Sequence, residues 1–196
     1  MPNWATNDLI VSGDEAAIEE FQLLAAGGDD EDGLCLLDFN QHSPAAPAPK
    51  GEKDPSDSKL IGRQVAAWGT KWRLAHGEVR VKGSAADGQV TYSFSSAWSP
   101  PVNWLARVGA LHDELSFELI WAEPGMGFAG QVLWDHGELV REEEYERDEA
   151  VAFITGKDRR AWLVWDEEED EEPEGYESPE SVSDDSPGQD EVSTDA

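Results

Sequence analysis

The chain has 196 residues, of which 43 are acidic and 14 basic, giving a formal net charge of −29 and a pI near 4.1. A surface this negative argues against direct binding of the chain to nucleic-acid phosphates or to an anionic membrane. No apolar run reaches the roughly eighteen residues of a membrane helix, and the N-terminus lacks the basic and apolar regions of a secretory signal, so we expect a soluble cytoplasmic protein.

The first predicted elements are a strand and a helix. Residues 8–11 form a short apolar run typical of a strand, and residues 12–14 offer capping side chains for a helix that stops at Gly27 and Gly28. The apolar stripe of this helix comprises Ile18, Phe21, Leu24 and Ala25. A Pro/Ala-rich stretch follows at 40–58, where four prolines exclude a helix or a central strand and predict a flexible insert.

Two strands are predicted beyond the insert. Apolar residues in 71–82 alternate with polar ones, and the buried face switches around 75–77, which indicates a bulge or a tight turn. The segment 89–97 alternates without interruption and is the most regular strand pattern in the chain.

A second helix and a hairpin follow these strands. Ser99-Pro100-Pro101 places a capping hydroxyl and two prolines where a helix begins. The apolar stripe of this helix comprises Trp104, Leu105, Val108 and Leu111. Residues 115–121 and 128–134 both alternate, on either side of a turn at 123–125, and therefore predict two hairpin strands.

This order of elements is typical of an α+β protein with a ferredoxin-like split β-α-β arrangement. We expect one antiparallel sheet with two helices on one face and extra C-terminal strands, in a domain of residues 1–165. Residues 148–165 are ambiguous, with a helical turn at 150–154 and a closing strand at 161–165 as candidates. Residues 166–196 contain fifteen acidic residues, no basic ones and few apolar ones, so we predict a disordered acidic tail.

Four short strings occur in an order that is typical of one family. They are Met1-Pro2-Asn3-Trp4 with Asn7, Trp68-Gly69-Thr70-Lys71-Trp72, Ala97-Trp98-Ser99-Pro100-Pro101, and Glu123-Pro124-Gly125 before Phe128-Ala129-Gly130. Through them, residues 1–140 resemble the YubB-like ferredoxin-fold family, whose members are carried by bacteriophages and conjugative plasmids. The resemblance implies a ferredoxin-like fold and a mobile-element accessory protein in the cytoplasm of a bacterial host, and it implies no reaction.

The same resemblance implies a structural role for several residues of these strings. They are Trp4, Gly69, Thr70, Trp98, Ser99, Pro100 and Pro101. The chain also departs from the family, because Ala5 stands where a cysteine is common and neither the insert nor the acidic tail belongs to the shared pattern. Any role of the tail is therefore particular to this chain.

The sequence carries no signature of catalysis or of a cofactor. It has no nucleophile elbow, no phosphate-binding loop and no dinucleotide-binding glycine motif. The single Cys35 excludes an internal disulfide and a multi-cysteine zinc site, and Asp135-His136-Gly137 predicts a hairpin turn rather than an acid–base pair.

A metal site would require isolated histidines to converge with carboxylates. These are His42, His76, His112 and His136. We expect no enzyme, no cofactor and no metal.

The tryptophans allow two interpretations. Trp68 and Trp72 flank Lys71 and precede Arg73, a mixture with which proteins bind single-stranded nucleic acid, and the surrounding segment 59–82 has six basic residues and one acidic residue. Alternatively, the tryptophans at alternating strand positions belong to the buried face of the sheet, which is the interpretation we favour. These tryptophans are Trp72, Trp98, Trp121 and Trp134.

The strongest functional signal is a run of seven carboxylates at the start of the tail. It comprises Asp166, Glu167, Glu168, Glu169, Asp170, Glu171 and Glu172. An extended chain advances about 3.3–3.6 Å per residue, close to the ~3.4 Å spacing of phosphates along a DNA strand, so the run suits the cationic groove of a nucleic-acid-binding protein. Acids of the body that would assist are Glu142, Glu143, Glu144 and Glu146. A solubility segment and a general, halophilic acidity are the alternatives.

Two functional hypotheses follow. In the first, a phage- or plasmid-encoded binding protein mimics nucleic acid and inhibits a host protein with a basic nucleic-acid-binding groove, such as a restriction enzyme, a CRISPR effector or a nucleoid protein. In the second, the tail only maintains solubility, and the Trp68–Trp72 region binds a protein or a single-stranded nucleic acid. Neither of these two hypotheses involves a membrane or a chemical reaction. A third and least favoured hypothesis, an enzyme acting on a small molecule, would require two or more of the histidines to converge with carboxylates in a deep cleft.

Overall fold

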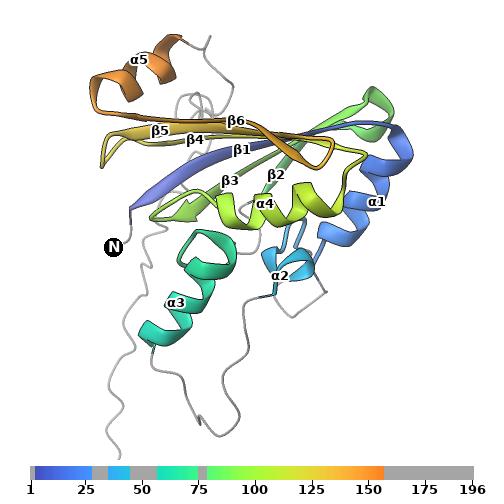
Figure 1. Ribbon diagram of the computed structural model, residues 1–196, viewed down its shortest axis with the longest axis horizontal. Coiled ribbons are helices and arrows are strands. Elements are labelled where there is room, and N and C mark those ends of the chain that lie inside the picture. Colours follow the sequence, from blue (N-terminus) through green and yellow to red (C-terminus); the bar gives the residue numbers. More distant parts are fainter. Residues whose placement is uncertain (1–2, 28–34, 45–56, 75–78, 157–196) are drawn as a thin grey trace, which may run out of the picture. The chain divides into compact units, whose positions relative to one another are not determined.

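A computed structural model describes residues 3–27, 35–44, 57–74 and 79–156 of the protein. In this part of the chain, six antiparallel strands form one sheet in the order β2-β3-β1-β4-β5-β6 (Figure 1). The strands are β1 (Trp4–Ser12), β2 (Arg80–Ser84), β3 (Gln89–Ala97), β4 (Ser116–Glu123), β5 (Phe128–Asp135) and β6 (Glu138–Glu146).

The centre of the sheet is β1, which lies between β3 and β4. Its Leu9 is paired with Tyr92 of β3 and with Leu119 of β4, so that three apolar side chains point to the same face. β2 pairs with β3, while β5 and β6 extend the sheet beyond β4. The predicted ferredoxin-like α+β fold with extra C-terminal strands is thereby confirmed.

Helices cover both faces of the sheet (Figure 1). The described helices are α1 (Glu15–Ala25), α2 (Phe39–His42), α3 (Asp57–Trp68), α4 (Val102–Leu111) and α5 (Asp148–Gly156). Residues of α1, α2, α3 and α4 pack on one face, and α5 packs on the other face over β5 and β6. α1 and α4 are the two helices predicted on one face, whereas α2 and α3, which pack there as well, were not predicted. α5 confirms helix at 150–154 and adds a helix on the other face. None of the described helices is long and apolar enough to cross a membrane.

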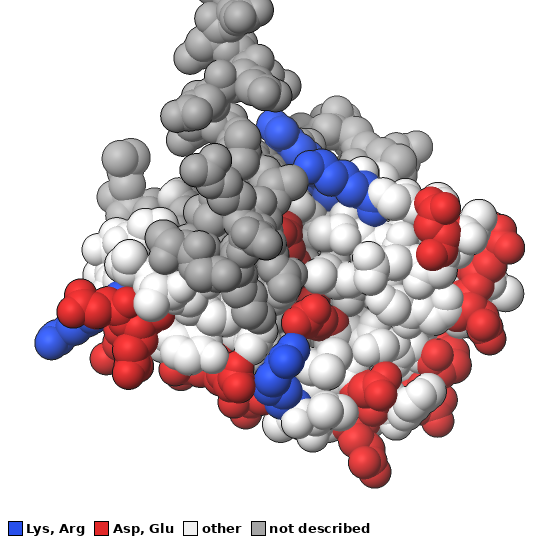
Figure 2. All heavy atoms as spheres, turned by 90° about the horizontal axis from the view of Figure 1, so that it is seen from above, with Lys and Arg blue, Asp and Glu red and all other residues white. Residues whose placement is uncertain are grey.

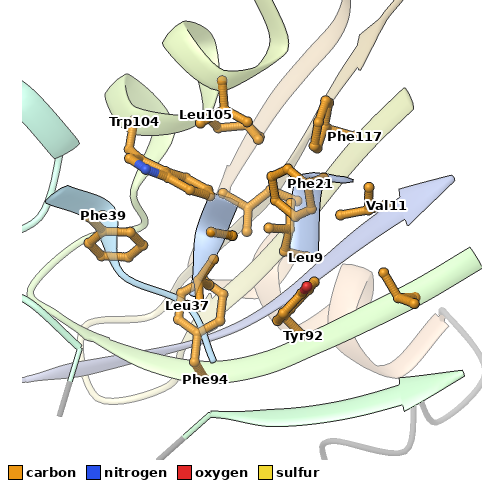
Figure 3. Close-up of a cluster of buried hydrophobic side chains, with 14 of the residues drawn as sticks. Leu9, Val11, Phe21, Leu37, Phe39, Tyr92, Phe94, Trp104, Leu105 and Phe117 are labelled. Atoms are coloured by element: carbon orange, nitrogen blue, oxygen red, sulfur yellow. The ribbon is translucent and has the colours of Figure 1, made fainter. Parts of the chain in front are cut away.

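The main core lies between the sheet and helices α1 to α4. Figure 3 shows Phe21 of α1 and Trp104 and Leu105 of α4 close to Leu9 and Tyr92 of the sheet. These side chains meet because successive strand residues face opposite sides, so every second residue of β1 and β3 is directed to the helices. A smaller cluster lies under α5 and comprises Ile120, Ala122, Ala129 and Ala150, with Ile10, Tyr145 and Phe153 packed against it.

The insert predicted at 40–58 has different boundaries in the structure. α2 extends to His42 because it precedes the first proline and because the Asp38 carboxylate accepts a hydrogen bond from the Asn40 amide at its N-terminus. α3 begins at Asp57, after the last of the four prolines. The four prolines lie in the sequence between these two helices, and residues 45–56 of that segment lie outside the described residues.

Two other element predictions were wrong. Residues 71–74 form no strand, because they belong to the connection after α3, and the strand starts at Arg80. Leu24 and Leu111, expected in apolar stripes, are 46% and 64% exposed because they lie on the outer sides of their helices. The strand candidate 161–165 and the acidic tail lie outside the described residues.

Candidate functional site

Three exposed tryptophans and one lysine gather at one end of the sheet, and we call them the tryptophan platform. Trp4, Trp72 and Trp98 are 43%, 38% and 49% exposed. The ring centroids of Trp4 and Trp72 are 6.0 Å apart, with the planes inclined by 55°. The Lys71 ammonium lies 4.5 Å from the ring centroid of Trp72 and 4.0 Å from that of Trp98. The four side chains therefore form one aromatic and cationic surface.

Backbone hydrogen bonds bring the three segments of the platform together. Trp98 follows the end of β3, and its amide donates to the carbonyl of Asn3 at 2.9 Å, just before β1 begins at Trp4. The Lys71 amide donates to the Ala97 carbonyl at 3.2 Å, and the Thr70 hydroxyl donates to the same carbonyl at 2.8 Å. The connection after α3 is thus fixed to the end of β3.

A chain of buried and partly buried side-chain hydrogen bonds supports the platform. The Asn7 amide nitrogen donates to the Ser96 hydroxyl at 2.9 Å, and Ser96 in turn donates to the Ser99 carbonyl at 2.9 Å. The Ser99 hydroxyl donates to the Gly69 carbonyl at 2.6 Å. Ser99 therefore links two loops and does not cap α4 as expected, since the residue at the N-terminal cap of that helix is Pro101.

Two backbone conformations are needed to bring the loops this close. Gly69 has a φ of +90°, and a Cβ at this position would lie 3.0 Å from the Pro100 carbonyl oxygen and 3.1 Å from the Val102 nitrogen. Trp98 itself has a φ of 74°, which is an outlier for a bulky residue. Unusual backbone geometry that is held by surrounding contacts is concentrated at functional sites.

The structure separates the residues of the predicted Trp68–Arg73 patch. Trp68 is buried, and its indole nitrogen donates to the Ser43 carbonyl at 2.6 Å, so it is part of the core. Trp72 and Arg73 are exposed, and Lys71 is half-buried between two indoles. The wider basic segment is not one patch, because its lysines and arginines are distributed over α3, the loop after it and β2. They are Lys59, Arg63, Lys71, Arg73, Arg80 and Lys82.

The expectation that four tryptophans line the buried face of the sheet holds for only two of them. Trp121 is buried in β4, and Trp134 of β5 packs against the main core. Trp72 and Trp98 lie outside the strands and are exposed, because they belong to loops at the end of the sheet. Trp4 and Trp98 were not identified as binding residues from the sequence, although both occur in the strings that carry the family resemblance.

A second charged feature is an acidic row on β6, the last strand of the described sheet. Glu142, Glu144 and Glu146 are exposed and alternate along the strand, so they share one face. Glu143 lies on the opposite face, where its carboxylate accepts hydrogen bonds from the Tyr145 hydroxyl at 2.8 Å and from the Gln131 amide. Glu143 is therefore separated from the other three acids with which it was grouped.

Acidic side chains also lie along the margins of the sheet face that carries α5, where basic side chains are fewer (Figure 2). One of the basic groups is neutralised locally, because Arg141 pairs with Glu118 at 2.9 Å. The acidic run 166–172 lies outside the described residues, so its position relative to this face stays a prediction.

The described histidines are not grouped with enough further ligands to hold a metal ion. His42 and His112 meet in the core with ring centroids 5.1 Å apart, and burial, followed by the neighbouring His112, lowers the pKa of His42 from 6.5 to about 4. His136 and Gly137 form the β5–β6 turn with positive φ values, as predicted, and the His136 ring contacts the Asp113 carbonyl at 3.1 Å. In the described part of the chain, no three His, Cys, Asp or Glu residues are placed to hold a metal. His76 lies outside that part.

Comparison with known proteins identifies the fold. The family model described as "Ferredoxin-like domain in Api92-like protein" matches residues 68–178, a range that includes three of the four platform residues. A crystal structure of the protein api92 from Yersinia pseudotuberculosis is similar to this chain, with a TM-score of 0.51 and 11% sequence identity, over 74% of this chain and 98% of that chain. At this identity the similarity shows a shared fold alone. No curated protein matches the sequence.

Proposed function

The chain belongs to the Api92-like proteins with a ferredoxin-like domain, and we propose that it is a non-enzymatic binding protein that recognises a protein partner through the tryptophan platform. The observation that carries this proposal is the exposure of three indoles on a scaffold of paired backbone and side-chain groups. Exposed apolar patches mark interaction sites, and tryptophan is enriched among the residues that contribute most to binding energy.

A protein partner suits this surface better than a single-stranded nucleic acid. Stacking of bases on indoles would require a cationic groove for the phosphates. The platform offers one cation, Lys71, and the exposed Arg73 follows two residues later in the chain. Trp68 is buried, and the chain as a whole carries a charge of −29. Approach of a polyanion would therefore be opposed by electrostatic repulsion.

The origin and location of the protein are part of the same proposal. Three of the four strings that resemble the YubB-like family contribute directly to the platform, through Trp4 and Asn7, through Lys71 and Trp72, and through Trp98. This convergence supports a common function for these strings. We accordingly propose an accessory protein of a phage or plasmid that acts on a host protein in the bacterial cytoplasm.

A second candidate function is mimicry of nucleic acid by the acidic groups. It is favoured by the row of Glu142, Glu144 and Glu146, whose side chains on one face of β6 repeat every ~6.6 Å, about twice the phosphate spacing along a DNA strand. The run 166–172 would extend this negative surface. The partner would then be a host protein with a basic nucleic-acid-binding groove, and inhibition would occur by competition.

A pull-down from bacterial host lysate tests the platform. The baits are the 196-residue chain and its Trp72→Ala/Trp98→Asn variant, in which asparagine is chosen because it tolerates the positive φ at position 98. The matched control is Leu111→Ala, which removes another exposed apolar side chain at the far end of α4. We expect the variant to lose a partner that the chain and the control both retain. Equal retention by all three baits would refute the proposed platform function.

A further inference from the structure

The Lys71 side chain lies in a slot between two indoles of the platform. Its ammonium is 4.0 Å from the ring centroid of Trp98 and 4.5 Å from that of Trp72. We propose that this slot is a binding site for a lysine side chain of the partner protein, and that Lys71 occupies it as an internal substitute until the partner displaces it. This inference rests on the proposed function and adds the chemistry of the partner to it.

The chemistry of the slot suits an ammonium group. The face of an indole is electron-rich and attracts a cation within about 6 Å of the ring centroid, and aromatic cages recognise ammonium ligands in this way. Both distances to Lys71 are well inside that range. Trp4 adds a third ring beside Trp72, at 6.0 Å between centroids. The site therefore already binds the functional group that we assign to the partner.

Lys71 is held in the slot by the rings alone within the described part of the chain. Among the ion pairs of the described residues are those of His112 with Glu114 and of Arg141 with Glu118, and no carboxylate of these residues pairs with Lys71. Release of Lys71 into water therefore breaks no salt bridge with a residue of the described part. A partner lysine that enters the slot restores the two cation–ring contacts. The free-energy change of this exchange is therefore close to zero before other contacts form.

The walls of the slot are fixed before any ligand binds. The Trp98 amide is bound to the Asn3 carbonyl, and the Lys71 amide is bound to the Ala97 carbonyl. The chain from Asn7 through Ser96 and Ser99 holds the two loops against each other. A preformed site loses little conformational entropy on binding, which favours recognition of a small cationic side chain.

Charge complementarity supports a basic partner. The chain has a net charge of −29, which raises the local concentration of a positively charged protein and accelerates its association. Lys71 is then replaced in the slot by a lysine of the partner, and the other basic residues of the partner are attracted by the acidic chain. A lysine-rich partner combines long-range attraction by the acidic chain with a specific contact at the platform.

An internal lysine also acts as a competitor of any external one. A tethered group has an effective concentration of the order of millimolar or more, so it masks a weak site from a free ligand. Removal of the Lys71 ammonium should therefore expose the slot. The probe is Nα-acetyl-lysine amide, with Nα-acetyl-norleucine amide as the uncharged probe of similar shape.

The experiment is a titration of each probe into the 196-residue protein, followed by the indole N–H resonances of Trp72 and Trp98. For Lys71→Ala we expect the dissociation constant of the lysine probe to be about tenfold or more lower than for the unaltered protein. Lys71→Arg should behave as the unaltered protein, because a cation still fills the slot. Lys82→Ala, which removes an exposed lysine of β2, is the matched control and should change nothing.

Three results would overturn the inference. They are equal affinity of the lysine probe for the unaltered protein and Lys71→Ala, equal binding of the norleucine probe, and unchanged binding when Trp98→Asn is added to Lys71→Ala. If the lysine probe fails while Trp72→Ala/Trp98→Asn still loses its partner, only this inference is refuted. If the probe binds as expected while that variant keeps the partner, the proposed platform function is refuted instead.

Discussion

Trp98 has an exposed indole and a backbone conformation that is unfavourable for a bulky residue. Its φ of 74° places the residue in the left-handed region, which costs a residue with a Cβ roughly 1–2 kcal/mol. Asparagine visits this region readily, so we expect Trp98→Asn to keep or increase the free energy of unfolding, by up to about 1 kcal/mol, despite the lost contact with Lys71. Urea denaturation measures this difference. The proposed binding role of the exposed indole would account for a tryptophan in this backbone conformation.

The control for this prediction is Trp98→Ala. It removes the same indole but keeps a residue that is strained at a positive φ, so it should unfold more easily than Trp98→Asn by about 1 kcal/mol. Equal stability of the two variants would contradict the argument from backbone strain, whatever their effect on binding.

His42 makes folding sensitive to pH. Its ring stacks on Phe21 and faces His112, and burial, together with a smaller effect of His112, lowers its pKa from 6.5 to about 4. Between these values the unfolded chain binds a proton that the folded chain does not. The contribution of neutral His42 to stability is therefore complete above pH 6.5 and falls as the pH drops towards 4. Urea denaturation over this pH range measures the decrease.

Carboxylates also titrate in this range, so the test compares variants. His42→Phe should remove part of the pH dependence, because phenylalanine can stack on Phe21 without binding a proton. His136→Asn, which changes a histidine in an exposed turn, is the matched control. An identical pH dependence for the unaltered protein and His42→Phe would show that His42 is not responsible.

At the level of elements, the alternation of apolar and polar residues predicted the strands well, because burial of one face of the sheet is enough to produce that alternation. β3 has the predicted bounds 89–97, and β4 and β5 form the predicted hairpin. α3 was not predicted, although Ile61, Val65 and Trp68 repeat at the spacing of one helix face. Its Leu60 and Val65 are 40% and 37% exposed, and it is anchored by residues at its C-terminal end, including Trp68.

The tryptophan platform was only partly predictable, for a different reason. Trp72 and Lys71 were recognised as binding candidates, but Trp98 was assigned to the buried face because aromatic residues usually face a core. Its exposure depends on a bond to the Asn3 carbonyl, from a segment 95 residues earlier in the chain. Periodicity contains no information on such contacts. The signal that could have identified the platform was the set of strings that resemble one family, because residues of three of these strings lie together in the structure.

Close packing between strands explains one glycine of these strings. A Cβ on Gly130 of β5 would collide with the Trp121 ring and lie 2.5 Å from the Glu143 carbonyl oxygen of β6. Neither neighbour can move freely, so we expect Gly130→Ala to lower the free energy of unfolding by about 1–3 kcal/mol. Chemical denaturation checks the value, and a neutral effect would mean that the sheet adjusts locally.

The matched substitution is Gly62→Ala in α3. Nothing lies within 4 Å of a Cβ at this position, and alanine is a better helix former than glycine. We expect Gly62→Ala to raise stability by about 0.5–1 kcal/mol. The opposite signs for two identical substitutions distinguish steric conflict in the sheet from intrinsic helix preference.

At the scale of the whole molecule, the negative charge is divided between the body and the tail. Residues 166–196 carry fifteen acidic groups and no basic ones, and the remaining 165 residues carry a net charge of −14. The body alone can therefore attract a basic partner, while the tail doubles the charge. The platform contact is short-range, and its strength depends less on ionic strength than the attraction between exposed charges does.

These two contributions respond differently to salt, and we expect a chain that ends at Trp165 to separate them. If the acidic run 166–172 occupies a basic groove, the 196-residue chain should retain its partner strongly at low salt and weakly at moderate salt, because bound counterions compete with each charge pair. The shortened chain should retain less partner at low salt and show a flatter salt dependence. Binding measured at several ionic strengths, with duplex DNA added as a competitor, gives both quantities.

The control replaces charge without changing length. A chain in which the carboxylates of 166–172 are changed to the corresponding amides should behave like the shortened chain if charge is decisive, and like the 196-residue chain if the length of the tail is what counts. Retention that is insensitive to salt and to DNA in all three proteins would exclude mimicry by the tail. Recognition would then depend on the tryptophan platform, and the acidic residues would serve solubility, as acidic groups on protein surfaces commonly do.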